Sequence, residues 1–190
     1  MKKLIILGHP ARDSFCKSIA DTYFGTAKET GHEVELLNLA SLKFDPILHE
    51  GYKLIQPFEP DLEHAKNLIS WADHLVWIYP NWWGAMPALQ KGFIDRVFTP
   101  GFAFKYRQNS NLWDKLLTGK SAHIYVTMDS PPWYYKWFTK MPGHNQMKHA
   151  ILQFCGISPI KITNFGPVKT SSDIQKNKWL KSVEVDAARN

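Results

Sequence analysis

Two adjacent tryptophans lie in a stretch of the chain whose residue types are suited to holding a flat ligand. The segment YPNWWGAMPALQKGF places Asn81, Trp82 and Trp83 between Pro80 and Pro87. The prolines restrict the backbone and hold the aromatic rings in a fixed shape. Rigid aromatic surface of this kind favours a planar heterocycle, but it is also typical of an oligomer contact or of rings that return to the core.

Polar side chains also gather directly after the first apolar run. The segment GHPARDSFCKS contains His9 and Ser14. Ser14 is suited to cap a helix whose first N–H groups, those of Phe15 and Cys16, point outward, and a phosphate group would fit there. The alternative is a plain strand-end turn without a ligand. The segment lacks the GxGxxG and GxxxxGK[ST] spacings, which argues against a dinucleotide-type Rossmann turn and a P-loop.

Five strand-like segments are separated by segments of helical spacing, which predicts five repeats of a strand followed by a helix. Apolar runs cover 3–7, 75–80, 122–128 and 159–165, and the segment 32–39 alternates apolar and polar residues. The helical patterns cover 13–30, 61–74, 87–98, 145–156 and 171–189. Nearly continuous apolar strands separated by helices favour a parallel sheet with helices on both faces. We expect a long functional loop at 99–118 and an aromatic-rich interruption at 131–143.

The order of these elements predicts where a ligand binds. In an open parallel sheet, ligands lie beyond the carboxyl ends of the strands, near the switch in strand order. The loops after the first, third and fourth strands are therefore the candidates. The first two are the polar segment and the tryptophan segment described above, and the third begins TMDSPPWYY at Thr127.

The bulk properties fit one globular domain spanning 1–190. The chain has 190 residues, of which 44% are apolar, and a net charge of +6, which favours anionic partners such as nucleotides. The two cysteines show no CxxC spacing and the histidines no clustering, so neither a disulfide framework nor a metal site is expected. Lys and Arg are scattered, which argues against nucleic acid. Without a signal peptide or a spanning segment, we expect the protein to be cytoplasmic.

Three segments together resemble a known family. The stretch YPNWWGAMPALQKGFIDRVFTPGFAF, with GHPARDSFCKSIA and ILQFCGI, is similar to the flavodoxin-like NAD(P)H:quinone oxidoreductases of the DT-diaphorase type, including small bacterial members and those associated with potassium-efflux systems. The resemblance covers most of the chain. It implies a three-layer α/β fold with a five-stranded parallel sheet in the order 2-1-3-4-5. It also implies a flavin cofactor, FMN or FAD, with NAD(P)H as co-substrate.

The resemblance assigns roles to residues of each loop. The residues expected to hold the flavin phosphate or ribityl chain are His9, Ser14, Phe15 and Cys16. The residues expected to pack along the isoalloxazine ring and bond it through their backbone are Pro80, Asn81, Trp82 and Trp83. Phe104 and Tyr106 match aromatic positions over the substrate site, which a partner subunit of a homodimer contributes.

The third loop departs from the family pattern. Relatives carry a Thr-Thr-Gly-Gly-like turn where this chain has Thr127, Met128, Asp129 and Ser130. These four residues are expected to meet the pyrimidine edge of the ring, but without glycine the backbone approaches a ligand less closely, and the aspartate would repel a reduced anionic flavin.

Three residues are the catalytic candidates, on the same resemblance. Tyr135 and His144 are candidates for the Tyr and His that hydrogen-bond the flavin during hydride transfer, and Tyr106 joins them at the substrate. His144 has a second interpretation, as a helix-cap neighbour with a solvated ring.

These observations predict a two-step hydride relay. NAD(P)H reduces the flavin and leaves, and a quinone or similar acceptor then takes two electrons at the same place, which gives ping-pong kinetics. The alternative is a flavin-binding regulatory subunit that associates peripherally with a potassium-efflux-type membrane transporter. A one-electron carrier is disfavoured, because such carriers dock basic partners and this chain is itself basic.

Overall fold

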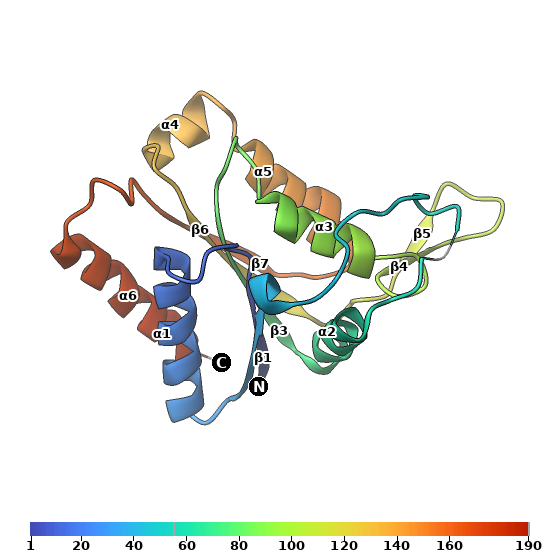
Figure 1. Ribbon diagram of the computed structural model, residues 1–190, viewed down its shortest axis with the longest axis horizontal. Helices are drawn as coiled ribbons and strands as arrows, with labels where there is room; N and C mark the ends of the chain where they lie inside the picture. The colour runs from blue at the N-terminus through green and yellow to red at the C-terminus, as the bar shows by residue number, and fades with distance from the viewer. Residues whose placement is uncertain (55, 190) are drawn as a thin grey trace.

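The computed structural model describes residues 1–54 and 56–189. A central sheet is flanked by helices on both sides (Figure 1). The strands are β1 Lys2–Leu7, β2 Glu33–Asn38, β3 His74–Pro80, β4 Phe104–Tyr106, β5 Trp113–Lys115, β6 Ser121–Thr127 and β7 Ile160–Phe165. The helices are α1 Phe15–Glu29, α2 Pro60–Trp71, α3 Ala88–Val97, α4 Pro132–Trp137, α5 Pro142–Asn145 and α6 Asp173–Ala187, with a short 3₁₀ turn η1 Leu39–Ser41 and a π-helix η2 Gln146–Gln153.

The five long strands form one parallel sheet in the order β2-β1-β3-β6-β7. Counted along the sheet strands alone, this is the predicted order 2-1-3-4-5, so the predicted fold is confirmed. β1, β3 and β6 are the central strands, and apart from their first residues they are almost entirely buried. Strands buried on both faces read as continuous apolar runs, which is why the sequence identified them.

Alternate side chains of each strand enter two separate cores. On one face, Ile5, Val76 and Tyr125 pack beneath α1 and α6, which lie side by side. On the other face, Ile6 and Trp77 pack beneath α2, α3 and η2. Figure 1 shows these two helix layers to the left and right of the sheet. The sheet is thereby covered on both faces, and its carboxyl edge is left to the loops.

Two segments expected to be irregular contain regular structure. The predicted long loop at 99–118 holds an antiparallel hairpin, in which β4 pairs with β5. The aromatic interruption at 131–143 holds α4 and the start of α5. Both corrections have the same cause: elements of three to six residues are too short to show a periodicity along the chain.

A buried arginine fixes the long irregular connection between η1 and α2. Arg96 on α3 is only 1% exposed, and its guanidinium donates to the carboxylate of Glu59 at 2.8 Å and to the carbonyl oxygen of Pro57 at 2.8 Å. A third bond reaches the carbonyl oxygen of Asp45. Asp45, Pro57 and Glu59 are thereby held in place, although the described residues of this connection have almost no secondary structure. In the part of the chain that the structure describes, we find no helix whose length and apolar character would let it cross a membrane.

Candidate functional site

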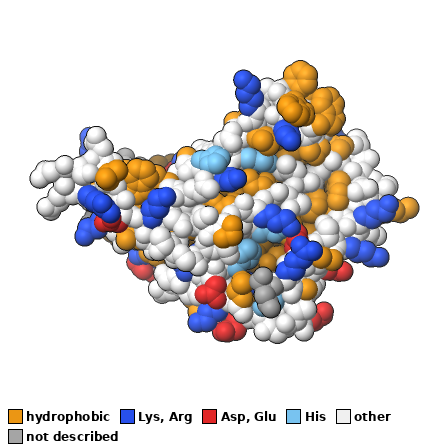
Figure 2. All heavy atoms as spheres, turned by 180° about the vertical axis from the view of Figure 1, so that it is seen from behind, with side chains coloured by type: hydrophobic (Ala, Val, Ile, Leu, Met, Phe, Trp, Pro, Cys, Tyr) orange, Lys and Arg blue, Asp and Glu red, His pale blue; other side chains and the backbone are white. Residues whose placement is uncertain are grey.

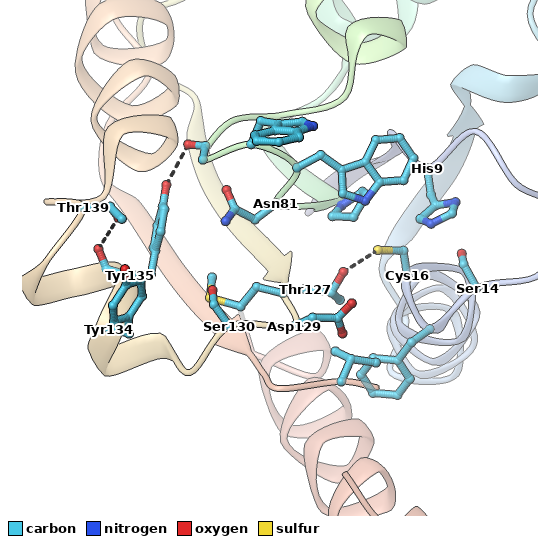
Figure 3. A pocket seen from close by; sticks show the side chains of 17 residues that line it. His9, Ser14, Cys16, Asn81, Thr127, Asp129, Ser130, Tyr134, Tyr135 and Thr139 are labelled. Carbon is cyan, nitrogen blue, oxygen red and sulfur yellow. Dashed lines mark hydrogen bonds between the residues drawn. The ribbon is translucent and has the colours of Figure 1, made fainter. Parts of the chain in front are cut away.

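A cavity of about 410 Å³ lies at the carboxyl edge of the sheet, beyond β1, β3 and β6 (Figure 3). All twelve residues predicted to bind a cofactor line this cavity, and so does Tyr135. The other lining residues are Gly84, Tyr134, Thr139 and Val168. The strand order places the three predicted loops side by side, so segments far apart in the sequence meet at one site.

The N-terminus of α1 forms one wall. Ser14 has an extended backbone, and its hydroxyl oxygen accepts a hydrogen bond from the backbone N–H of Lys17 at 3.2 Å, which caps the helix. The N–H groups of Phe15 and Cys16 donate to no other residue among the described ones. Free donors at the positive end of a 15-residue helix make this wall suited to an anion.

The thiol of Cys16 belongs to the same wall but is not set up as a nucleophile. Its sulfur lies 3.2 Å from the hydroxyl oxygen of Thr127, the last residue of β6. Burial raises the pKa of Cys16 to about 12, against the smaller opposite effect of the Thr127 hydrogen bond. The thiol is therefore neutral at physiological pH and serves to close the wall.

His9 faces the cavity as a neutral donor. Its Nδ1 accepts a hydrogen bond from the backbone N–H of Ala11 at 3.0 Å, and its ring meets Trp82 edge-on with centroids 5.6 Å apart. Burial lowers the pKa of His9. Because Nδ1 is occupied as an acceptor, the ring proton lies on Nε2, which is left to donate to a ligand.

The tryptophan loop is a tight turn in an unusual conformation. The backbones of Trp82 and Ala85 exchange two hydrogen bonds at 2.9 and 3.0 Å. Between them Trp83 and Gly84 both have positive φ, 53° and 80°. Glycine adopts this conformation freely, whereas tryptophan does so at a cost in free energy. The side chain of Trp83 is fully exposed, so within one chain no packing compensates this strain. Strain of this kind is typical of functional sites.

The third loop approaches its neighbours without a glycine of its own. The backbone N–H of Met128 donates to Phe165 at the end of β7, and the carbonyl of Met128 accepts from Val168. A side chain on Gly166 would lie 2.7 Å from that carbonyl, so the glycine that permits close contact sits after β7. The carboxylate of Asp129 accepts a hydrogen bond from the backbone N–H of Lys169 at 3.0 Å. The loop is thus tied to the segment after β7.

Tyr135 and His144, the two residues predicted to hydrogen-bond the flavin, lie next to each other, but only Tyr135 lines the cavity. Their ring centroids are 5.0 Å apart. Only 5% of His144 is exposed, so the interpretation of a solvated ring is wrong. Its Nε2 lies 2.7 Å from the amide oxygen of Asn164, and burial lowers the pKa of His144. His144 does not itself line the cavity and reaches it through Tyr135, while Asn164 is a partner that no sequence motif indicated.

Phe104 and Tyr106 are not brought to the cavity within one chain. Both lie on the β4–β5 hairpin, at the right in Figure 1 and away from α4. Phe104 is buried against Phe154, with ring centroids 5.0 Å apart, whereas Tyr106 is 60% exposed. Any role for Tyr106 at a substrate therefore requires a second copy of the chain.

The described residues contain no group of His, Cys, Asp or Glu side chains arranged to hold a metal ion.

Val168 and Thr139 line the cavity although the sequence did not single them out. Val168 follows β7, the neighbour of β6 in the sheet. The loop after the fifth sheet strand could therefore have been added to the candidate loops from the sequence. No sequence signal marked Thr139, which follows the short helix α4. Its hydroxyl donates to the carbonyl oxygen of Tyr135 at 2.7 Å, a contact that exists only once the helix has formed.

Comparison with known proteins gives consistent results. A family model described as a flavodoxin-like fold matches residues 1–184. A protein of Haemophilus influenzae, named as an uncharacterized NAD(P)H oxidoreductase, is 30% identical over 178 residues, which cover 91% of this chain and 87% of that protein.

Two solved structures share the fold. The NAD(P)H:quinone oxidoreductase from Methanothermobacter marburgensis superposes with a TM-score of 0.82 at 22% identity, covering 100% of this chain and 98% of that one. An FMN-dependent NADH-azoreductase from Bacillus anthracis, in complex with FMN, gives 0.76 at 19% identity, covering 100% and 99%. At these identities the likeness establishes the fold alone.

Proposed function

The chain belongs to this flavodoxin-like family of NAD(P)H oxidoreductases, and from that premise we propose that it passes two electrons from NAD(P)H to a quinone through a bound flavin. The observation that carries the proposal is that one cavity is lined both by a helix N-terminus suited to an anion and by the two tryptophans of a fixed turn, Trp82 and Trp83. A flavin nucleotide has both parts, a phosphate and a planar ring.

The residues present fit a flavin. The cavity volume of about 410 Å³ lies in the range of cofactor pockets. The free N–H groups of Phe15 and Cys16, with Nε2 of His9 beside them, suit the phosphate. Trp82 and Trp83 offer apolar faces to the ring. The names of the M. marburgensis and B. anthracis structures support quinone as acceptor and flavin as cofactor. FMN and FAD both meet these requirements.

When bound, the flavin supplies the hydride chemistry, accepting two electrons from NAD(P)H and returning them to the acceptor in a second half-reaction. The protein binds and orients. Tyr135 holds the turn that carries Trp83, because its hydroxyl donates to the carbonyl oxygen of Gly84 at 3.0 Å. His144, fixed by Asn164, supports Tyr135 from behind. The aromatic walls exclude water from the reacting ring.

The proposed active form is a homodimer. Trp83 is fully exposed, and Tyr106 lies on a projecting hairpin far from the cavity of its own chain. A second copy whose β4–β5 hairpin brings the exposed Tyr106 over this cavity, with Phe104 packed beneath it in the hairpin, would cover the tryptophan and complete a slot for NAD(P)H and the quinone. The relatives described above bear no transporter name, so the role as a transporter subunit stays a prediction of the sequence.

An anaerobic absorbance titration tests the proposal. The purified protein is supplied with FMN or FAD, titrated with NADPH or NADH, and then given a simple quinone. We expect the bound flavin to bleach and the quinone to restore its colour, with parallel lines in initial-rate plots for a ping-pong sequence. A bound flavin that stays oxidised with both nucleotides would contradict the enzymatic proposal, and no binding of either flavin would contradict the assignment of the cavity.

A further inference from the structure

We propose that the outer face of α4 is a docking surface for an anionic lipid bilayer. The aromatic residues that form this surface, here called the α4 patch, are Trp133, Trp137 and Phe138. They are 60%, 70% and 68% exposed. Three large aromatic side chains exposed within six residues are far more than the scattered apolar residues of an ordinary surface.

Two rings of the patch, those of Trp133 and Phe138, form a cluster with Tyr134. Phe138 stacks on Tyr134 with centroids 5.0 Å apart, and Trp133 meets Phe138 edge-on at 6.3 Å. Figure 2 shows hydrophobic side chains gathered at the upper right corner, where α4 lies in this reversed view. Trp and Tyr prefer the boundary between headgroups and acyl chains, because each combines a large apolar ring with one polar group. The composition of the patch matches that boundary.

The charge around the patch selects the kind of bilayer. Lys136 and Lys140 are exposed among the aromatic residues, and Nζ of Lys136 lies 5.3 Å from the ring centroid of Trp137. From Ser130 to Ser172 the chain contains no Asp or Glu. The nearest acid along the chain, Asp129, already accepts a hydrogen bond from the backbone of Lys169. Aromatic residues interleaved with lysine complement anionic headgroups.

The place of α4 gives the docking a consequence. Tyr134, Tyr135 and Thr139 line the cavity, so the same short segment contributes both to the cavity wall and to the patch. A bilayer on the patch would lie beside the mouth of the cavity. This consequence rests on the proposed function: a quinone with an apolar tail would then reach the cavity from the lipid phase. The docking itself does not depend on it.

Vesicle flotation tests the docking and needs neither flavin nor turnover, so its failure is separate from failure of the proposed function. The full-length protein is mixed with phosphatidylcholine vesicles, with and without phosphatidylglycerol. We expect flotation only with phosphatidylglycerol, and weaker flotation as salt rises. The triple variant W133S/W137S/F138S should lose binding while its melting temperature is unchanged or higher, since the three side chains are exposed.

A matched pair of charge variants separates the patch from general attraction. K136E/K140E should bind at least about 25-fold more weakly, since each basic residue near anionic lipid contributes about fivefold. K178E/K181E changes the net charge equally on the exposed side of α6 and should bind nearly as the wild type does.

Three results would overturn the proposal. The first is a wild-type protein that floats with neither vesicle. The second is equal weakening by the two charge variants, which would mean that overall charge drives binding. The third is a triple variant that changes only the oligomeric state in sedimentation, which would mean that a second copy covers the patch.

Discussion

The hydroxyl of Tyr135 lies 3.0 Å from the carbonyl oxygen of Gly84, although the two residues are 51 positions apart. The same hydroxyl oxygen accepts a hydrogen bond from the backbone N–H of Gly143 at 3.0 Å. One phenol therefore joins the tryptophan turn to the start of α5. The shape of the cavity depends on this junction, because the turn that carries Trp83 has no other tie to α4 or α5 among the described hydrogen bonds.

The variant Y135F is expected to lower the free energy of unfolding by about 1–2 kcal/mol, since it leaves a buried donor and a carbonyl without partners. It should also weaken flavin binding by loosening the turn. Urea denaturation and a flavin fluorescence titration measure the two effects. Y134F is the control, because the hydroxyl of Tyr134 has no hydrogen-bond partner among the described residues, and its unfolding free energy should equal that of the wild type. Equal stability of Y135F and Y134F would contradict the junction.

The variant W83N is expected to change stability and binding in opposite directions. Asparagine tolerates a φ of 53° better than tryptophan, and the exposed ring has no packing to lose within one chain. We expect the unfolding free energy of the flavin-free monomer to rise by about 0.5–1 kcal/mol. Flavin affinity should fall about tenfold with the loss of the aromatic face. W82N, at a residue that has no positive φ and contacts His9, should not gain stability, and a gain there would argue against backbone strain as the cause.

The two cysteines are expected to be unreactive in the native protein. Burial raises the pKa of Cys16 and that of Cys155 to about 12, so almost no thiolate is present at pH 8. An aromatic disulfide reagent releases its own coloured thiolate when a protein thiol attacks it. We expect no rapid release with the native protein, and release of two equivalents per chain in guanidinium chloride. Rapid native labelling of Cys16 would show that the helix terminus outweighs burial there.

Acid should destabilise the fold in part through His74. Burial lowers the pKa of His74 from 6.5 to about 4, so between these values the unfolded chain binds a proton that the folded chain does not. Stability is therefore present above pH 6.5 and is lost as the pH falls toward 4, by about 1.4 kcal/mol per pH unit for this one proton. H74N should reduce the slope of the unfolding free energy against pH, between pH 4 and 6.5, by about one proton. An equal slope in the variant and the wild type would contradict the assignment of this proton to His74.

Much of the fold could be predicted because its central strands are buried on both faces. Ile5, Val76 and Tyr125 lie within largely apolar runs, and parallel pairing requires the helical crossovers that the sequence also showed. The three candidate loops follow from strand order alone, so the residues of each were identified from their place after a strand.

The rest depends on contacts between distant segments. Arg96 reads as an ordinary polar residue on a helix, yet it is 1% exposed and binds Glu59, 37 positions earlier. Asn164 lies on an edge strand and is fixed by its bond to His144. Gly166 supplies the close approach that the third loop lacks. None of these pairings leaves a periodic trace along the chain, because side chains at such separations meet only after the sheet has formed.

The separation between Cys16 and Thr127, 111 positions apart yet in contact, has a consequence for biosynthesis. A nascent chain has no complete cofactor wall until β6 has left the ribosome and joined β3. Capture of the flavin is then a late event in folding, and a cofactor that binds the native state alone stabilises it in proportion to the logarithm of its free concentration. The cellular supply of flavin would thus set how much of this protein persists in the folded state.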